Sequence, residues 1–177
     1  MKPLMPFTLA LAVTTLLASG VMAGEHHADK AKNADLDRFK ALVGTWEMTG
    51  MQDEHGPGGP ATVTYKITAG GNAVLETVFA GSEHEMVTLY YVEGDGLALT
   101  HYCMLGNQPQ MKAMPKAGDN KIAFEFVKAT NLKSEKDMCM RSVTFTFVDK
   151  DTLKTEWTMY HDGKAAEKMV FDLKRKK

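Results

Sequence analysis

The feature that most constrains this chain is a long series of short segments in which apolar and polar side chains alternate. From residue 44 onward these segments recur at ~8–12-residue spacing, which is typical of a β-sandwich or a β-barrel. Turn-forming sequences lie between them, such as Gly94-Asp95-Gly96 and Gly118-Asp119-Asn120. Short turns make neighbouring strands antiparallel. The sequence therefore predicts an all-β domain with strands over residues 44–50, 61–69, 73–80, 85–92, 97–104, 109–114, 121–128, 138–148, 152–160 and 166–173.

The alternation also assigns the two faces of each predicted strand, because successive side chains of a strand point in opposite directions. In residues 61–69 the apolar face carries Val63 and Tyr65, and in residues 152–160 it carries Trp157. The opposite faces carry lysine and glutamate residues, which we expect to face water. One apolar face per strand suits a sandwich and a closed barrel equally well.

The N-terminus has the three parts of a secretory signal peptide. Lys2 provides a short basic region, residues 7–17 provide an apolar region, and Val21-Met22-Ala23 provides a cleavage sequence. The apolar region is too short to span a bilayer as a helix. We therefore expect residues 1–23 to be removed on export and the protein to be periplasmic or secreted; an uncleaved N-terminal anchor is the alternative.

The remaining chain divides into a flexible leader over residues 24–33 and one domain over residues 34–177. No second apolar stretch is long enough to cross a membrane, so we expect no stable membrane insertion. The sequence has 21 basic and 22 acidic residues, so it lacks the excess of basic residues that is typical of a nucleic-acid-binding protein. The oligomeric state cannot be predicted from these patterns.

A short helix is expected over residues 34–42, capped by Asp35. It leads into Phe39-Lys40-Ala41-Leu42-Val43-Gly44-Thr45-Trp46-Glu47, which resembles the start of lipocalin-type and related calycin barrels. The succession of about ten short strands also resembles the fatty-acid-binding and nitrobindin-like members of that group. The resemblance implies a single antiparallel up-and-down β-barrel of about ten strands with a short N-terminal helix. It also implies that Trp46 closes one end of the barrel over a ligand cavity.

Two further segments, residues 100–109 and 156–164, resemble uncharacterised exported bacterial proteins with such barrels. That resemblance implies a compartment and a fold and supplies no function.

The candidate ligand-binding residues are polar or aromatic side chains on predicted inward faces. Counting by two from Leu99 places His101 inward, and counting back from Val143 places Arg141 inward. A buried arginine is costly unless a partner or a polar cavity accommodates it. His101 and Arg141 therefore indicate a polar end to an otherwise apolar cavity, the arrangement that binds a carboxylate head and an apolar tail. The candidate site comprises His101, Arg141, Tyr65 and Trp157; a bulge that turns Arg141 to solvent is the alternative.

The two cysteines of the chain, Cys103 and Cys139, are also predicted inward. In an oxidising compartment such a pair is usually a disulfide. Two buried free thiols, or a pair of soft metal ligands, remain as alternatives.

Metal binding is the second interpretation of the function. After cleavage the chain would begin Gly24-Glu25-His26, which supplies an amine, two backbone amides and an imidazole in the square-planar arrangement that suits Cu(II) or Ni(II). The 13 methionines provide soft sulfur ligands for Cu(I), although methionine also fills irregular cores. A haem held by His101 belongs to the same alternative. Otherwise no cofactor is expected.

No catalytic motif of the common families occurs in the sequence. The preferred interpretation is an exported protein that binds a small, partly apolar ligand inside a β-barrel, with a carboxylate-bearing molecule as one candidate. A small hydrolase or isomerase on the same barrel is the third interpretation.

Overall fold

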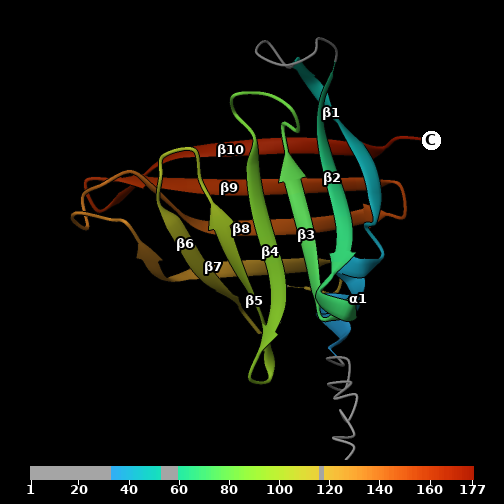
Figure 1. Ribbon diagram of the computed structural model, residues 1–177, viewed down its shortest axis with the longest axis horizontal. Helices are drawn as coiled ribbons and strands as arrows, with labels where there is room; N and C mark the ends of the chain where they lie inside the picture. Colours follow the sequence, from blue (N-terminus) through green and yellow to red (C-terminus); the bar gives the residue numbers. More distant parts are fainter. Residues whose placement is uncertain (1–32, 53–59, 116–117) are drawn as a thin grey trace, which may run out of the picture.

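The computed structural model describes residues 33–52, 60–115 and 118–177. Over these residues it is one short helix followed by a closed, ten-stranded antiparallel barrel (Figure 1). The elements are α1 (Ala34–Lys40), β1 (Gly44–Gln52), β2 (Pro60–Thr68), the 3-10 turn η1 (Ala69–Gly71), β3 (Ala73–Val78), β4 (Met86–Glu93), β5 (Gly96–Tyr102), β6 (Gln108–Ala113), β7 (Lys121–Thr130), β8 (Cys139–Asp149), β9 (Thr152–His161) and β10 (Lys164–Arg175).

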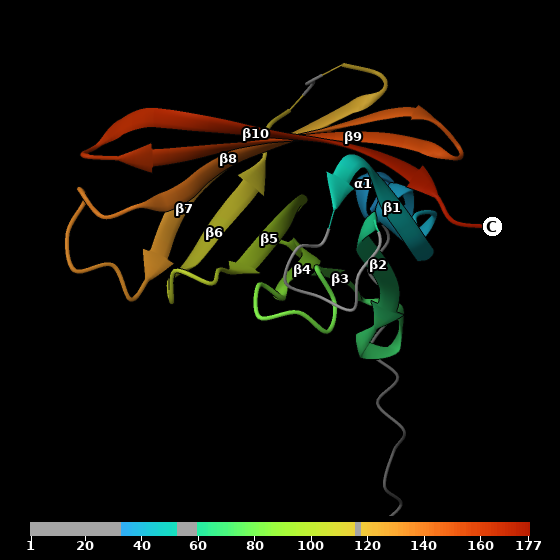
Figure 2. The same ribbon diagram turned by 90° about the horizontal axis from the view of Figure 1, so that it is seen from above.

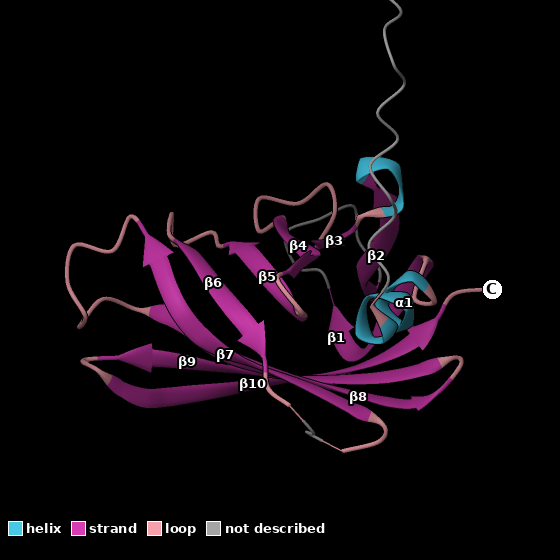
Figure 3. Cartoon of the chain, turned by 90° about the horizontal axis from the view of Figure 1, so that it is seen from below, coloured by secondary structure: helices cyan, strands magenta, loops and turns pink. Residues whose placement is uncertain are grey.

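Each strand pairs with its neighbours in the sequence, and β1 pairs with β10 to close the sheet. The register of that closing pair sets Trp46 opposite Arg175. All ten predicted strands are present. Because β1 pairs with β10, the sheet is closed, and the fold is a barrel and not a sandwich. Strands cover most of the described chain, as the magenta arrows of Figure 3 show. No helix of the described residues is long and apolar enough to cross a membrane.

The connections between antiparallel strands alternate between the two ends of the barrel. The helix end carries α1 together with the connections β2–β3, β4–β5, β6–β7 and β8–β9. The opposite end, here the loop end, carries the connections β3–β4, β5–β6, β7–β8 and β9–β10, over residues 79–85, 103–107, 131–138 and 162–163. Figure 2 shows the long strands β8, β9 and β10 along one side and β3 to β7 along the other.

The interior at the helix end is filled by aromatic side chains. Phe39 of α1 is fully buried, and its ring stacks on Tyr90 at 4.1 Å and meets Phe145 edge-on at 4.9 Å. The helix is capped by Asn33, whose side chain accepts a hydrogen bond from the Leu36 amide, so the expectation of an Asp35 cap was wrong. The helix therefore acts as a plug that packs into one half of the barrel.

β8 contains a β-bulge, so the period-two counting that sent Cys139 and Arg141 inward does not hold across it; Cys139 is nevertheless fully buried, and the Arg141 side chain is 15 % exposed. The β8–β9 register pairs Met140 with Met159 and then Ser142 with Thr158, which leaves one extra residue in β8. A bulge of this kind interrupts the period-two alternation. Met140 takes the core position that simple counting assigned to its neighbours.

Candidate ligand-binding site

Four inward-facing polar side chains lie side by side on four consecutive strands. Tyr65 of β2 is paired with Glu76 of β3, Glu76 with Thr88 of β4, and Thr88 with His101 of β5. All four are at most 3 % exposed. We call this set the polar row. It crosses an interior whose other side chains are almost all apolar, so its members must satisfy one another.

Glu76 is the centre of the polar row. Its two carboxyl oxygens accept hydrogen bonds from the Tyr65 hydroxyl at 2.8 Å and from the Tyr90 hydroxyl at 2.5 Å. Thr88, the register partner of Glu76 on β4, lies beside this carboxyl group. Burial raises the pKa of Glu76, and the hydrogen bonds from Tyr90 and Tyr65 offset part of that rise. The pKa of both tyrosines is raised as well, first by burial and then by the nearby Glu76 charge.

His101 ends the polar row on the side of the loop end. Its Nδ1 lies 2.9 Å from the Thr88 hydroxyl oxygen, and its ring lies 4.9 Å from the Trp157 ring. Burial lowers the pKa of His101 to about 4, so the imidazole is neutral near pH ~7. Its Nε2 has no hydrogen-bond partner among the described residues. One nitrogen of the ring is thus held in place, and the other is free to contact a ligand.

The inward-facing side chains differ in how completely they are buried. Phe124 and Phe145, beside α1, are fully buried, whereas Trp157 in the middle of β9 is 7 % exposed. Nearer the loop end the inward-facing apolar side chains are partly exposed, and they include Phe126, Met159 and Met169. Apolar side chains toward the loop end are thus incompletely buried. Flexible methionines suit such a surface, because they adapt to ligands of irregular shape.

Arg141 does not contact His101. Its guanidinium donates to the Glu135 carboxylate at 2.8 Å and to the Glu135 carbonyl at 3.0 Å. It also lies over the rings of Phe126, at 4.7 Å, and of Tyr160, at 5.5 Å. The bulge in β8 brings Arg141 to the β7–β8 loop. The predicted pairing of Arg141 with His101 as two polar anchors of one site is not present.

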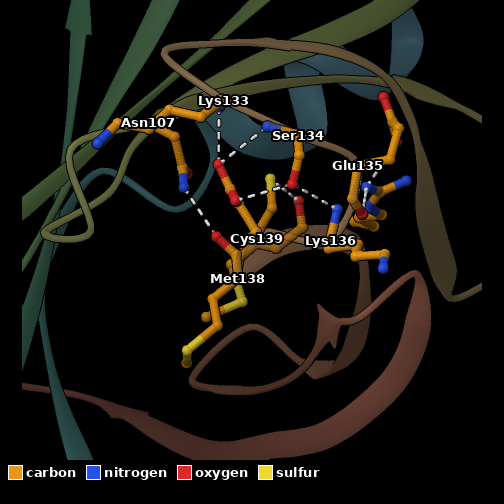
Figure 4. A network of polar contacts seen from close by, with 10 residues as sticks. Asn107, Lys133, Ser134, Glu135, Lys136, Met138 and Cys139 are labelled. Atoms are coloured by element: carbon orange, nitrogen blue, oxygen red, sulfur yellow. Dashed lines mark hydrogen bonds and ion pairs between the residues drawn. The ribbon is translucent and has the colours of Figure 1, made fainter.

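The loops at the loop end are joined by hydrogen bonds (Figure 4). Asp137 accepts hydrogen bonds from the amides of Lys133 and Ser134 and so shapes the β7–β8 loop. Asn107 of the β5–β6 loop donates to the Met138 carbonyl at 2.8 Å. The Asp162 amide of the β9–β10 connection donates to a carbonyl of the β7–β8 loop. These three connections consequently form one connected rim beside the candidate site.

Cys103 and Cys139 are both buried and both free thiols. Cys103 follows the end of β5 and is held by hydrogen bonds between its backbone and those of Gly106 and Asn107. Burial raises the pKa of each thiol, that of Cys139 to about 11. Of the alternatives left by the sequence, the structure has two buried thiols, which are poor nucleophiles when protonated.

The other predicted site residues lie where period-two counting placed them. Tyr65 is buried in the polar row, and Trp157 is inward with its ring tilted against that of His101. The proposed N-terminal copper ligands, Gly24, Glu25 and His26, lie outside the described residues. Within the described ranges, no group of three histidine, cysteine, aspartate or glutamate side chains is arranged to hold a metal ion.

Two members of the polar row were missed in the sequence. Glu76 follows Val74 and precedes Val78 on the apolar face of β3, so period-two counting contains the signal for a buried carboxyl group. Thr88 could be found in the same way, since it shares a face with Tyr90. That these residues form one row with His101 depends on the register of four strands.

No family model matches the sequence, and no curated protein matches it. Among solved structures, the chain is similar to the crystal structure of Rv2717c from M. tuberculosis, with a TM-score of 0.54 and 13 % sequence identity. The similarity covers 83 % of this chain and 100 % of the mycobacterial chain. At that identity the likeness supports the barrel fold alone.

Proposed function

We propose that this protein is exported and binds a small, partly apolar molecule inside the barrel, between the polar row and the loop end. His101 and Trp157 are the residues that contact the molecule, and partly exposed apolar side chains such as Met159 and Phe126 surround its body. Tyr65 supports the site from within the row and does not touch the ligand. Membership of the calycin group is part of the same proposal and is supported by the short helix, by Gly44 and Trp46 on the first strand, and by the closed barrel.

One observation carries the proposal. His101 is 3 % exposed and neutral, its Nδ1 is bonded to Thr88, its Nε2 has no hydrogen-bond partner among the described residues, and the Trp157 ring lies 4.9 Å away. Nε2 is not one of the fully buried side-chain atoms that lack a partner among the described residues, so a ligand or a water can reach it. Ligand pockets characteristically combine apolar walls with a few placed polar groups.

Native mass spectrometry of the full chain, purified from the compartment into which it is exported, tests the proposal directly. We expect an added mass of a few hundred daltons, absent from His101→Phe and retained in His161→Phe. The second variant is a matched control, because His161 is an exposed histidine at the end of β9. An unliganded barrel that also fails to bind apolar probes would contradict the proposal.

Export is tested separately by N-terminal sequencing of the mature protein. We expect the sequence to begin at Gly24, after Val21-Met22-Ala23. A mature protein that retains residues 1–23 would contradict export by cleavage.

A second candidate ligand is a haem or a copper ion. Neutral imidazole nitrogen is a common metal ligand, and the free Nε2 of His101 is the observation that favours this candidate. The mass measurement separates the two: the mass of a haem or a metal supports the second candidate, and the mass of a metal-free organic molecule supports the first.

A further inference from the structure

We propose that the molecule bound beside His101 carries a neutral hydrogen-bond acceptor of the carbonyl class, and that this acceptor binds the indole N–H of Trp157. Thr155 is a further ligand-binding residue of the same site. This inference rests on the proposed function and specifies the ligand class and one more contact of that site. Side-chain polar atoms of the interior that lack a partner within the protein point to this class.

The two tryptophans of the chain differ in what their indole N–H groups contact. Both side chains are buried, Trp46 at 0 % exposure and Trp157 at 7 %. The Trp46 indole donates to the Leu42 carbonyl at 2.8 Å, whereas the Trp157 indole has no acceptor among the described residues. A buried indole N–H usually finds a partner, and it can only donate. The N–H of Trp157 is therefore a donor to which the described protein supplies no acceptor.

Thr155 is in the same situation on the same face of β9. It lies two residues before Trp157, so both side chains point into the barrel, and it is 2 % exposed. Its hydroxyl has no hydrogen-bond partner among the described residues. Successive inward positions of a strand are only about 7 Å apart, so one small molecule can span both side chains.

The free polar atoms of this region keep exposed surface. The described side-chain atoms that are fully buried and lack a partner are Asn107 Oδ1 and Arg141 Nε. The Trp157 nitrogen, the Thr155 hydroxyl and the Nε2 atom of His101 also lack a partner but are not among them. The rings of His101 and Trp157 are 4.9 Å apart, which brings β5 and β9 together at this point. A small molecule beside Trp157 therefore reaches His101 on one strand and Thr155 on the other.

Trp157 determines which kind of hydrogen-bonding group the ligand must present. The Thr155 hydroxyl can donate or accept, and the role of the His101 Nε2 atom depends on its tautomer. The indole N–H of Trp157 can only donate. A ligand that satisfies the indole must therefore present an acceptor, whichever tautomer His101 adopts.

The charges of the interior favour a neutral acceptor over a carboxylate. The buried polar and charged residues of the described chain include no lysine and no arginine; they are Glu76, Thr88, His101, Asn107 and Thr155. The guanidinium of Arg141, at the loop end, is already paired with the Glu135 carboxylate. A buried carboxylate without a cation is costly, whereas a neutral carbonyl is not. The aromatic face of Trp157 favours a flat apolar body for the rest of the molecule.

Proton–nitrogen NMR of the full chain, with the tryptophans labelled, tests the free N–H directly. Without ligand, we expect the indole proton of Trp157 to exchange with water faster than that of Trp46, which is bonded to Leu42. On addition of 2-acetylnaphthalene, a flat ketone, we expect the Trp157 indole proton to shift downfield while the Trp46 proton stays in place. The spectrum of Trp157→Phe assigns the two signals. A Trp157 proton that does not shift when the ketone is bound overturns the inference.

Three probes of one shape test the ligand class. They are 2-acetylnaphthalene, 2-isopropenylnaphthalene, in which a CH₂ group replaces the carbonyl oxygen, and 2-naphthoate, which is an anion. We expect the ketone to bind about tenfold more tightly than the other two, since one hydrogen bond accounts for about that factor. Transfer from water to an apolar site would by itself favour the hydrocarbon, so a preference for the ketone reports the hydrogen bond.

Matched variants assign the preference to individual side chains. It should disappear in Trp157→Phe, which keeps an aromatic face without the N–H, and persist in Tyr160→Phe, which removes a hydroxyl from the opposite face of β9. Thr155→Val should weaken binding of the ketone several-fold, whereas Thr158→Val, also on the opposite face, should not; equal binding in the two overturns the role of Thr155.

Equal binding of all three probes by wild type overturns this inference and leaves the proposed function standing. Failure of all three in a barrel that is also empty by mass overturns both.

Discussion

The guanidinium of Arg175, on the last strand, lies 4.3 Å from the ring centroid of Trp46, its register partner on the first strand. It donates to the carbonyls of Val43 and Ala41, both at 2.8 Å, and the Trp46 indole donates to the Leu42 carbonyl, also at 2.8 Å. Both ends of the barrel sheet are thereby fixed to the segment between α1 and β1. Gly44, at the start of β1, has a φ of +125°, a conformation that residues with a β-carbon rarely adopt.

Arg175→Ala is expected to lower the free energy of unfolding by about 2–4 kcal/mol, because charge-assisted bonds to two carbonyls and the contact with Trp46 are lost together. Arg175→Lys should recover only part of this, since an ammonium cannot reproduce the planar fork. Urea unfolding measures both. The exposed neighbour Lys174→Ala is the control and should stay within about 0.5 kcal/mol of wild type; an equal loss in both alanine variants would contradict the role of Arg175.

The carboxyl group of Glu76 should contribute as an acceptor of hydrogen bonds. Glu76→Leu leaves the buried hydroxyls of Tyr65 and Tyr90 without this acceptor, and we expect it to destabilise the fold by about 2–5 kcal/mol. Glu76→Gln keeps one acceptor oxygen and removes a buried charge, so it should remain within about 1 kcal/mol of wild type. Chemical unfolding distinguishes the two, with the exposed Glu125→Gln as control. If Glu76→Leu proves as stable as wild type, the hydroxyls have other partners.

The lowered pKa of His101 predicts a pH dependence of stability. In the folded state the imidazole stays neutral down to about pH 4, whereas in the unfolded chain it takes up a proton below about pH 6.5. The unfolded state therefore binds more protons in this window, and stability should fall as the pH falls from about 6.5 to about 4. The raised pKa of Glu76 acts in the opposite direction above its ordinary value.

The His101 contribution is obtained by comparing wild type with His101→Phe across this window. Between about pH 6.5 and about pH 4, the free energy of unfolding should fall by up to about 3 kcal/mol more in wild type than in His101→Phe. This figure is the upper limit for a pKa shift of this size. Urea unfolding at a series of pH values measures it, with His161→Phe as the control. Parallel curves for wild type and His101→Phe would contradict a buried, neutral His101.

The thiols of Cys103 and Cys139 should be free and slow to react. Their burial and raised pKa predict that a disulfide reagent modifies them far more slowly in the native protein than in urea. Thiol counting on unfolded, unreduced protein should find both cysteines. Asn107→Ala should speed the native reaction, because Asn107 connects the β5–β6 loop to Met138 beside Cys139. Absence of free thiols in protein from an oxidising compartment would show that the pair is bonded there.

Local sequence patterns were sufficient to predict the strands and several inward residues. The alternation around Tyr65, His101 and Trp157 is a property of each strand alone, so counting by two placed all three in the interior. Short turns determine that adjacent strands are antiparallel, and this also depends only on neighbouring residues.

The contacts between segments far apart in the sequence were decided by the tertiary structure. The pairing of Trp46 with Arg175 closes the barrel, and the register of β2 to β5 brings Glu76 between Tyr65 and Thr88. The bulge in β8 turns Arg141 toward Glu135, where strict alternation had sent it to the interior. The physical reason is common to all three: closure, register and bulges depend on how a strand fits a partner far away in the chain, whereas period and turn type are set by residues next to one another.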